Sequence, residues 1–261
     1  MEKALSLSHV TYTYHTCQGE TRAVDDITFD VEKGEFIAVV GPSGCGKSTL
    51  LHLIANLLSP SKGNIFIEGR PVSLVSENIG YMLQKDHLLE HRTILQNITL
   101  GLEIQKKVTQ KNLERIQEMM EQYGLYDFRN VYPRQLSGGM RQRAALIRTL
   151  ALSPELLLLD EPFSALDYQT RLRVSDDIGT IIKTKKITAI LVTHDLSEAI
   201  SMADRVIVLS SRPGKIKKIL PIHFETEPAS PEAARNAPEF KDYFNQIWKE
   251  IKNESCTKNS K

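Results

Sequence analysis

Apolar residues along the chain fall into short continuous runs, and these runs alternate with longer segments in which apolar positions recur every three or four residues. This alternation is typical of helices packed on a largely parallel sheet, so it predicts an α/β fold. Strands are expected at Phe36–Val40, Asn64–Ile67, Ile79–Leu83, Leu156–Leu159, Thr188–Val192 and Val206–Leu209. The first, fourth and fifth runs are almost wholly aliphatic, as strands covered on both faces require, and we expect them at the centre of the sheet.

The strand pattern disappears between Thr93 and Ala151, where apolar side chains recur at helical spacing among Glu and Lys residues. Such amphipathic periodicity indicates helices that bury one face. We therefore expect a helical insertion in this part of the chain.

The C-terminal part of the chain has a different composition. The stretch Pro221–Pro238 holds four prolines and several acidic residues, which predicts a linker that crosses the surface. A final helix is expected after it, because apolar residues recur at helical spacing at Phe240, Tyr243, Phe244, Ile247, Trp248 and Ile251. We expect this stripe to pack back onto the body of the protein.

Composition and charge narrow the class of protein. The length of 261 residues allows one large domain or two small ones. Apolar residues make up 41% and charged residues 25%, which argues against disordered and fibrous architectures. The 33 basic and 32 acidic residues leave a net charge of +1, so we expect no nucleic-acid partner. No 18-residue apolar run, secretion signal or C-x-x-C pair is visible, so we expect a cytoplasmic protein without a disulfide framework or zinc site.

A phosphate-binding loop is predicted directly after the run Phe36–Val40. Residues 41–49 match the pattern G-x-x-x-x-G-K-[ST] between a strand and a helix, which is the context that the pattern requires. Backbone N–H groups of such a loop point at phosphate oxygens, and the helix N-terminus adds partial positive charge. Lys47 is expected on the β- and γ-phosphates, and Ser48 on Mg²⁺, which prefers oxygen ligands. The expected ATP-binding residues here are Gly41, Pro42, Ser43, Gly44, Cys45, Gly46, Lys47, Ser48 and Thr49.

Two further strand ends carry candidate chemistry. Asp160 and Glu161 follow the run Leu156–Leu159. Asp160 is expected to hold the water shell of Mg²⁺, and Glu161 to polarise a water molecule for attack on the γ-phosphate. His194 follows the run Thr188–Val192 and is expected to contact the γ-phosphate. The phosphate-binding loop alone leaves open a kinase, a GTPase, a helicase or a motor.

The segment Leu136–Arg143, with the sequence LSGGMRQR, resembles the signature motif of ATP-binding cassette (ABC) proteins. Locally, Ser137 is predicted to cap a helix, and helix N-termini of this kind bind anions. In the resembling family this helix start faces the γ-phosphate of an ATP held by a second cassette. The resemblance therefore implies a head-to-tail dimer in which these residues contact ATP across the interface: Ser137, Gly138, Gly139 and Met140.

Other motifs follow in the order of the family. Gln84 resembles the Q-loop glutamine that contacts Mg²⁺ and the attacking water. Tyr14 resembles the aromatic residue that stacks on adenine, although Tyr12 lies two residues away and is an alternative. The D-loop, which crosses the dimer interface in the family, is matched by Ser164, Ala165, Leu166 and Asp167. The resemblance thus implies catalytic roles for Glu161, His194 and Gln84, and Mg²⁺ coordination, partly through water, by Ser48, Gln84 and Asp160.

The resemblance also implies a domain plan, a P-loop NTPase fold with a RecA-like core, an antiparallel β subdomain and a helical insertion. On this plan residues 1–220 form the ABC ATPase domain. Residues 1–85 and 156–220 supply the core and the β subdomain, and residues 86–155 the helical subdomain with the signature motif. Residues 221–261 form a C-terminal linker and helix.

A single cassette resembles the detached nucleotide-binding subunit of an ABC importer, peripheral at the cytoplasmic face of the cell membrane. The implied partners are a second ABC subunit, expected to be an identical copy, integral-membrane permease subunits and, indirectly, an extracytoplasmic solute-binding protein. The block Val208–Ile216 is similar to importers of nitrate, sulfonate and taurine, so a small anion is the expected solute. The alternatives are an importer of another class, such as one for a pyrimidine or thiamine precursor, and a non-transport ABC ATPase.

Two positions depart from the family pattern. Met140 stands where the consensus signature has Gln, but the serine and glycines are intact, so activity is expected to survive. Glu90 and His91 stand where related sequences often have Pro-Trp. In the family this loop lies near the membrane partner, so the second departure bears on partner choice and not on chemistry.

Overall fold

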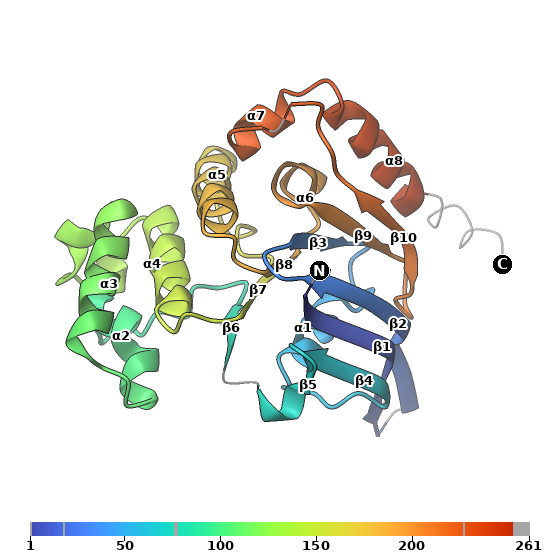
Figure 1. Ribbon diagram of the computed structural model, residues 1–261, viewed down its shortest axis with the longest axis horizontal. Coiled ribbons are helices and arrows are strands. Elements are labelled where there is room, and N and C mark those ends of the chain that lie inside the picture. The colour runs from blue at the N-terminus through green and yellow to red at the C-terminus, as the bar shows by residue number, and fades with distance from the viewer. Residues whose placement is uncertain (1, 18, 76–77, 227, 253–261) are drawn as a thin grey trace.

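The computed structural model describes residues 2–17, 19–75, 78–226 and 228–252, and it contains two sheets (Figure 1). The larger sheet has six strands in the order β10–β9–β3–β8–β7–β6, all parallel except β10. These strands are β3 (Phe36–Val40), β6 (Ile79–Met82), β7 (Leu156–Asp160), β8 (Ala189–Val192), β9 (Arg205–Leu209) and β10 (Ile216–Pro221).

The predicted strands form, and β3, β7 and β8 lie inside the larger sheet as their aliphatic composition indicated. The run predicted at 79–83 is one residue shorter, because β6 ends at Met82 and Leu83 is exposed. Successive side chains of β7 enter different cores. Leu156 and Leu158 belong to one hydrophobic cluster and Leu157 and Leu159 to the other, so the sheet separates the two cores and is covered on both faces.

The smaller sheet is antiparallel in the order β2–β1–β4–β5, and α1 (Lys47–Ile54) contacts β2 and strands of the larger sheet. Its strands are β1 (Lys3–Thr16), β2 (Gly19–Glu32), β4 (Lys62–Ile67) and β5 (Arg70–Pro71). The run Asn64–Ile67 is β4. No apolar run predicted β1 and β2, although the family resemblance implied an antiparallel β subdomain. Their pairing shifts register repeatedly, and His9 and Asp26 have positive φ, so no regular alternation of apolar residues marks them.

The helices α2, α3 and α4 form the part at the left of Figure 1, and all three lie within residues 86–155. The helices α5 and α6 follow later in the chain and lie beside the larger sheet. The bounds of these helices are α2 (Ile94–Ile104), α3 (Gln110–Gln122), α4 (Gly138–Leu150), α5 (Tyr168–Thr184) and α6 (Leu196–Met202). Single 3-10 turns are formed by Val72–Leu74, Tyr126–Phe128 and Pro133–Gln135.

The expected linker at 221–238 is wrong in part, because this stretch contains α7 (Pro231–Arg235) and begins with the last residue of β10. Arg235 Nη2 donates to both carboxylate oxygens of Asp176 of α5, at 2.8 and 2.7 Å, so the stretch is anchored to α5. The predicted last helix is α8 (Phe240–Lys252), which packs on α6 and β9. Ile247 is fully buried, whereas Trp248 is 51% exposed, so the apolar stripe is only partly covered.

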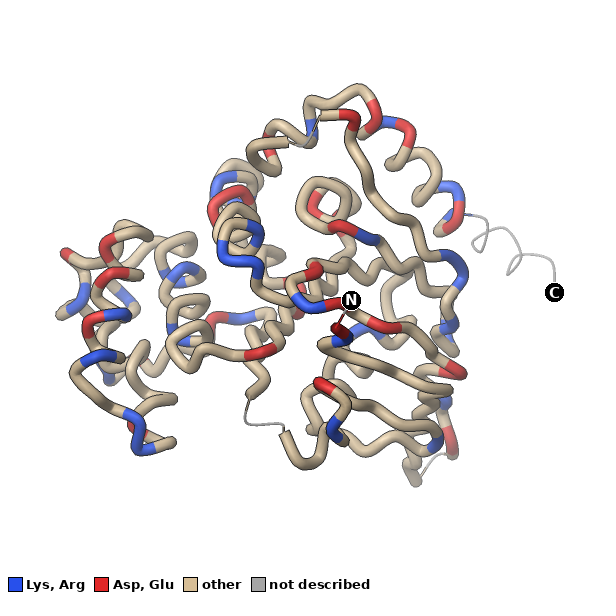
Figure 2. The backbone as a smooth tube through the Cα atoms, viewed as in Figure 1, with Lys and Arg blue, Asp and Glu red and all other residues tan. Residues whose placement is uncertain are grey.

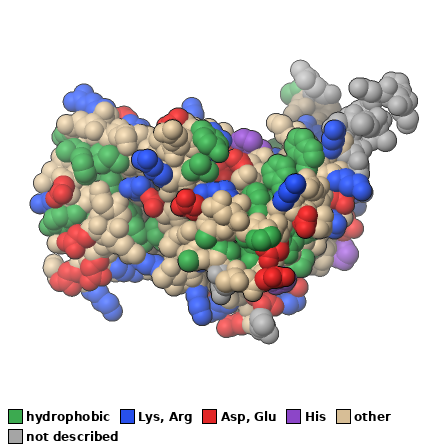
Figure 3. All heavy atoms as spheres, turned by 90° about the horizontal axis from the view of Figure 1, so that it is seen from above, with side chains coloured by type: hydrophobic (Ala, Val, Ile, Leu, Met, Phe, Trp, Pro, Cys, Tyr) green, Lys and Arg blue, Asp and Glu red, His purple; other side chains and the backbone are tan. Residues whose placement is uncertain are grey.

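Acidic and basic residues are interspersed along the backbone in all parts of the fold (Figure 2). The face seen from above likewise carries small alternating groups of hydrophobic, acidic and basic side chains (Figure 3). This face shows no continuous basic stripe of the kind that binds nucleic acid. Among the described residues, no helix is both long and apolar enough to cross a membrane.

Replacing Ile247 by Ala is expected to lower the free energy of unfolding by about 2–4 kcal/mol, because it leaves a cavity where α8 meets the core. The substitution Gln246→Ala, at an exposed position of the same helix, is the matched control and should change the free energy of unfolding by less than about 1 kcal/mol. Urea unfolding of both variants measures the difference. Equal losses in the two variants would show that α8 is not held through Ile247.

Candidate nucleotide site

The carboxyl ends of β3, β8 and β7 meet at one edge of the larger sheet, because these strands are adjacent and parallel. Backbone hydrogen bonds extend the pairing beyond the strands. Thr193 N–H donates to Val39 O at 3.3 Å, and Glu161 N–H donates to Val192 O at 2.8 Å. The three loops with predicted chemistry are therefore brought together, as parallel sheets do at ligand sites.

A cavity of about 230 Å³ lies at this edge and is lined by Ser43, Gly44, Gly46, Lys47, Ser48, Thr49, Glu161 and Arg212. Lys47 is only 6% exposed, and its ammonium donates to the carbonyl oxygens of Gly41 at 2.9 Å and Pro42 at 3.1 Å. Among the predicted loop residues, Cys45 differs from its neighbours. Its side chain is buried in the core below the loop, so Cys45 could reach a phosphate only through its backbone.

The start of α1 is shaped for an anion. Gly46 has φ +107°, and an added Cβ would lie 2.7 Å from Ala23 O, so only glycine fits there. No side chain caps the first N–H groups of α1. These donors, together with Lys47, are suited to hold phosphate oxygens.

Asp160 lies at the end of β7 between two hydroxyl donors. Ser48 Oγ donates to Asp160 Oδ1 at 3.0 Å, and Tyr81 Oη donates to Asp160 Oδ2 at 3.2 Å. Burial raises the pKa of Asp160 above its ordinary value, and the two hydrogen bonds oppose that shift. Burial and the neighbouring carboxylate also raise the pKa of the Tyr81 hydroxyl, which therefore stays a donor. Tyr81 was not among the predicted site residues, although its place on β6, three residues before Gln84, could have identified it as one.

Glu161 is turned away from the direction of the preceding strand. Its φ of +44° lies in the left-handed region, which few residues other than glycine adopt. Its carboxylate lines the cavity, and Glu161 Oε2 lies 3.1 Å from His194 Nδ1. The two predicted catalytic groups are thus in direct contact, as a general base and the residue that orients it would be.

Gln84 and Ser164 connect two of the predicted loops. Gln84 Nε2 donates to Ser164 Oγ at 3.2 Å, and Ser164 Oγ donates to Glu161 O at 2.9 Å. The predicted Mg²⁺ ligands offer oxygen donors, which suits this hard cation. Ser48 and Asp160 are already in contact, whereas the structure holds Gln84 on the D-loop. Mg²⁺ held by these predicted ligands would neutralise part of the negative charge of the phosphates.

The signature residues take their predicted local structure but lie outside the cavity. Ser137 caps α4, since its Oγ accepts a hydrogen bond from Met140 N–H at 3.3 Å. Ser137 and Gly138 are exposed. Asp167 of the predicted D-loop caps α5 by accepting from Thr170 N–H at 3.1 Å. Within one chain, therefore, the signature motif does not complete the phosphate site.

The two candidate tyrosines touch each other, with ring centroids 4.9 Å apart in an edge-to-face arrangement. Tyr14 Oη lies 3.2 Å from Thr49 Oγ1, beside the phosphate-binding loop. Tyr12 packs against the core cluster instead. This arrangement favours Tyr14 over Tyr12 as a contact for the base of a nucleotide.

Arginines of α4 tie the signature helix to the segment after Gln84. Arg141 forms a bidentate pair with Asp86, at 2.8 and 3.1 Å, and a second pair with Glu90 at 2.9 Å. Burial alone would raise the pKa of Asp86, but hydrogen bonds from Arg141 and Leu88 N–H hold it below its ordinary value. The departure at Glu90 therefore adds an ion pair that a proline there could not make.

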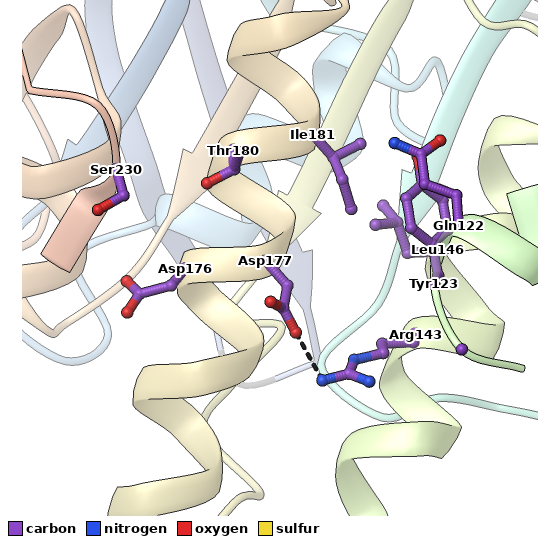
Figure 4. Close-up of a pocket in the computed structure, with 10 residues that line it drawn as sticks. Gln122, Tyr123, Arg143, Leu146, Asp176, Asp177, Thr180, Ile181 and Ser230 are labelled. Carbon is purple, nitrogen blue, oxygen red and sulfur yellow. Dashed lines mark hydrogen bonds and ion pairs between the residues drawn. The ribbon is translucent and has the colours of Figure 1, made fainter.

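A larger cavity, of about 560 Å³, lies elsewhere, between α3, α4 and α5 (Figure 4). Its acidic groups are already paired, Asp177 with Arg143 and Asp176 with Arg235. None of the predicted site residues lines it. Phosphate chemistry points to the smaller cavity, where Lys47, Ser48 and Glu161 converge.

Comparisons with known proteins identify the family of the chain. Residues 24–164 match the family described as ABC transporter. The uncharacterized ABC transporter ATP-binding protein YtlC of Bacillus subtilis is 49% identical over 247 residues, covering 95% of each chain. The aliphatic sulfonates import ATP-binding protein SsuB of Bacillus cereus is 39% identical over 216 residues, covering 83% of this chain and 85% of that protein.

Solved structures show the same fold. The dimeric ABC transporter cassette MJ0796 matches with a TM-score of 0.73 and 29% identity, covering 84% of this chain and 99% of that one. A second structure of MJ0796, bound to ADP and Pi in a post-hydrolysis state, matches with a TM-score of 0.70 and 28% identity. These matches confirm the predicted P-loop NTPase fold class.

A buried carboxyl group beside the site is expected to make the stability of the protein depend on pH. Glu198 of α6 accepts a hydrogen bond from Thr193 Oγ1 at 2.6 Å, next to His194. Burial raises the pKa of Glu198 to about 7 from 4.5. Between about pH 4.5 and 7, the folded protein therefore keeps this proton while the unfolded chain releases it. The protonated carboxyl group thus stabilises the fold fully below about pH 4.5, and this stabilisation is lost as the pH rises through about 7.

Glu198→Gln should remove this dependence. Between pH 5 and 8 the wild type is expected to lose up to about 3 kcal/mol of unfolding free energy relative to the variant, which has no group to ionise there. Urea unfolding at several pH values measures the difference. If the unfolding free energies of the two proteins changed in parallel with pH, Glu198 would not be buried in its protonated form.

Proposed function

This chain belongs to the family of ABC transporter ATP-binding proteins, and on that premise we propose that it is the ATP-hydrolysing subunit of an ABC importer. The proposal is supported mainly by the way the candidate site residues fall into two separate groups. The groups suited to phosphate, metal and water meet in one cavity, while the exposed signature residues lie outside it. A second copy stacked head to tail would supply them.

Each half of the proposed dimer has distinct tasks. The loop Gly41–Thr49 holds the phosphates, Tyr14 stacks on the base, and Ser48, Asp160 and Gln84 hold Mg²⁺, partly through water. Glu161 activates the water molecule, and His194 orients Glu161 and contacts the γ-phosphate. Ser137 of the second copy closes over the γ-phosphate from its helix N-terminus.

The link to a membrane permease is proposed through the helical insertion. Gln84 touches the D-loop, and the segment just after it is fixed to α4 by Arg141. Closure of the dimer around ATP would therefore move α2, α3 and α4 together with the segment that follows Gln84. ATP can drive such a switch only through its higher affinity for the closed dimer, and reversing a 1:99 population takes about 5.5 kcal/mol. The protein would act at the cytoplasmic face of the membrane.

A small anion is the proposed solute, with an extracytoplasmic binding protein delivering it. The similarity to an aliphatic sulfonates importer favours sulfonate or a related anion such as taurine or nitrate. The more similar YtlC carries no substrate in its name, so a solute of another importer class is the second candidate.

Glu161→Gln is expected to leave ATP binding intact, because the amide keeps the size of the side chain and the phosphate loop is unchanged. Hydrolysis should slow by roughly 100- to 10,000-fold, since the general base is lost. An ATP-stabilised dimer should then accumulate, as size-exclusion chromatography with ATP would detect. The exposed Glu121→Gln serves as control, and unchanged turnover in the Glu161 variant would remove Glu161 from this role.

Co-purification from native membranes tests the transport assignment. The tagged chain is expected to bring down a multi-span permease, and ATPase activity should rise when that permease is present. Recovery of the chain with ribosomes, with DNA or alone would leave the ATPase assignment standing and would contradict the assignment to transport.

A further inference from the structure

The turn after β9 is built as a closed unit. Ser210 N–H donates to Lys215 O at 2.8 Å, and Lys215 N–H donates to Ser210 Oγ at 2.9 Å. The same hydroxyl donates to Pro213 O at 3.0 Å. These bonds fix the backbone that carries Arg212.

The turn is held against the phosphate-binding loop by Gly214. Its N–H donates to Ala23 O and its carbonyl accepts from Asp25 N–H, both at 2.9 Å. An added Cβ on Gly214 would lie 2.3 Å from Cys45 O, so the two backbones touch and no larger residue fits. Lys215, on the far side of Gly214, pairs with Asp25 at 3.0 Å.

This contact places Arg212 on the wall of the cavity formed by the phosphate-binding loop, beside Lys47 and Glu161. Arg212 is exposed, and it makes no ion pair with any residue that the structure describes. Lys47, the other cation on this wall, already donates to two carbonyl groups. A guanidinium on such a wall is suited to a bidentate contact with phosphate oxygens.

We propose that Arg212 is a nucleotide-binding residue that contacts a phosphate group of ATP from the turn after β9. The inference rests on the proposed function, because it requires the nucleotide to occupy this cavity. It adds a cation from the block Val208–Ile216, to which the resemblance gave no role in ATP binding. Arg212 would raise the affinity for ATP without taking part in the activation of water.

Arg212→Ala is expected to weaken ATP binding about 5- to 20-fold, as measured by titration calorimetry, because a charged phosphate contact is lost. Arg212→Lys should keep part of the affinity for ATP, since the positive charge remains but the planar guanidinium with its paired N–H donors is lost. The control Lys215→Ala removes a cation from the same turn outside the cavity and should bind ATP within about twofold of wild type. In ATPase assays the KM of Arg212→Ala should rise while kcat stays within about threefold.

Lys47→Ala separates the two possible failures. If Lys47→Ala loses ATP affinity while Arg212→Ala binds as wild type does, the role of Arg212 is wrong and the proposed site stands. If Lys47→Ala also binds ATP normally, the nucleotide does not occupy this cavity, and both proposals fall. An equal loss of ATP affinity in Arg212→Ala and Lys215→Ala would show that the turn as a whole is disturbed, and would contradict a contact between Arg212 and a phosphate group.

Discussion

The structure depends on the burial of three adjacent parallel strands, β3, β8 and β7, on both faces. Their side chains enter two separate hydrophobic cores, and parallel backbone ladders pair β3 with β8 and β8 with β7. Their carboxyl ends are consequently fixed side by side. The phosphate-binding loop, Asp160–Glu161 and His194 each follow one of these ends, and their mutual distances are set by the sheet and not by the loops themselves.

This constraint bears on the proposed division of the active site between two copies. The sheet edge gathers the groups proposed to hold phosphate and activate water, whereas the signature residues at the start of α4 lie outside the cavity at that edge. Arg141, Asp86 and Glu90 bind α4 to the segment after β6, so movement of the helical part and movement of that segment are coupled. Such an arrangement suits a protein whose chemistry is completed by a second copy.

The sequence alone predicted much of this and failed where local pattern carries no information. The aliphatic runs identified β3, β7 and β8 correctly, because strands buried on both faces have no polar positions. The apolar pattern did not mark the long hairpin of β1 and β2, because register shifts and left-handed residues such as His9 break its alternation, and only the family resemblance implied an antiparallel β subdomain. Motif residues were identified by spacing, whereas Tyr81 and Arg212 join the site only through tertiary contacts with residues distant in the chain.

If the active site is divided between two copies, two variants that are inactive alone should complement each other when they are mixed. Lys47→Ala disables the phosphate loop and Ser137→Arg disables the signature, so each homodimer should be inactive. Their 1:1 mixture should form heterodimers with one intact site and recover up to about a quarter of wild-type ATPase activity, because half the dimers are mixed and each has one of two sites. A mixture that forms heterodimers, as labelled subunits would report, yet recovers no activity would contradict the account.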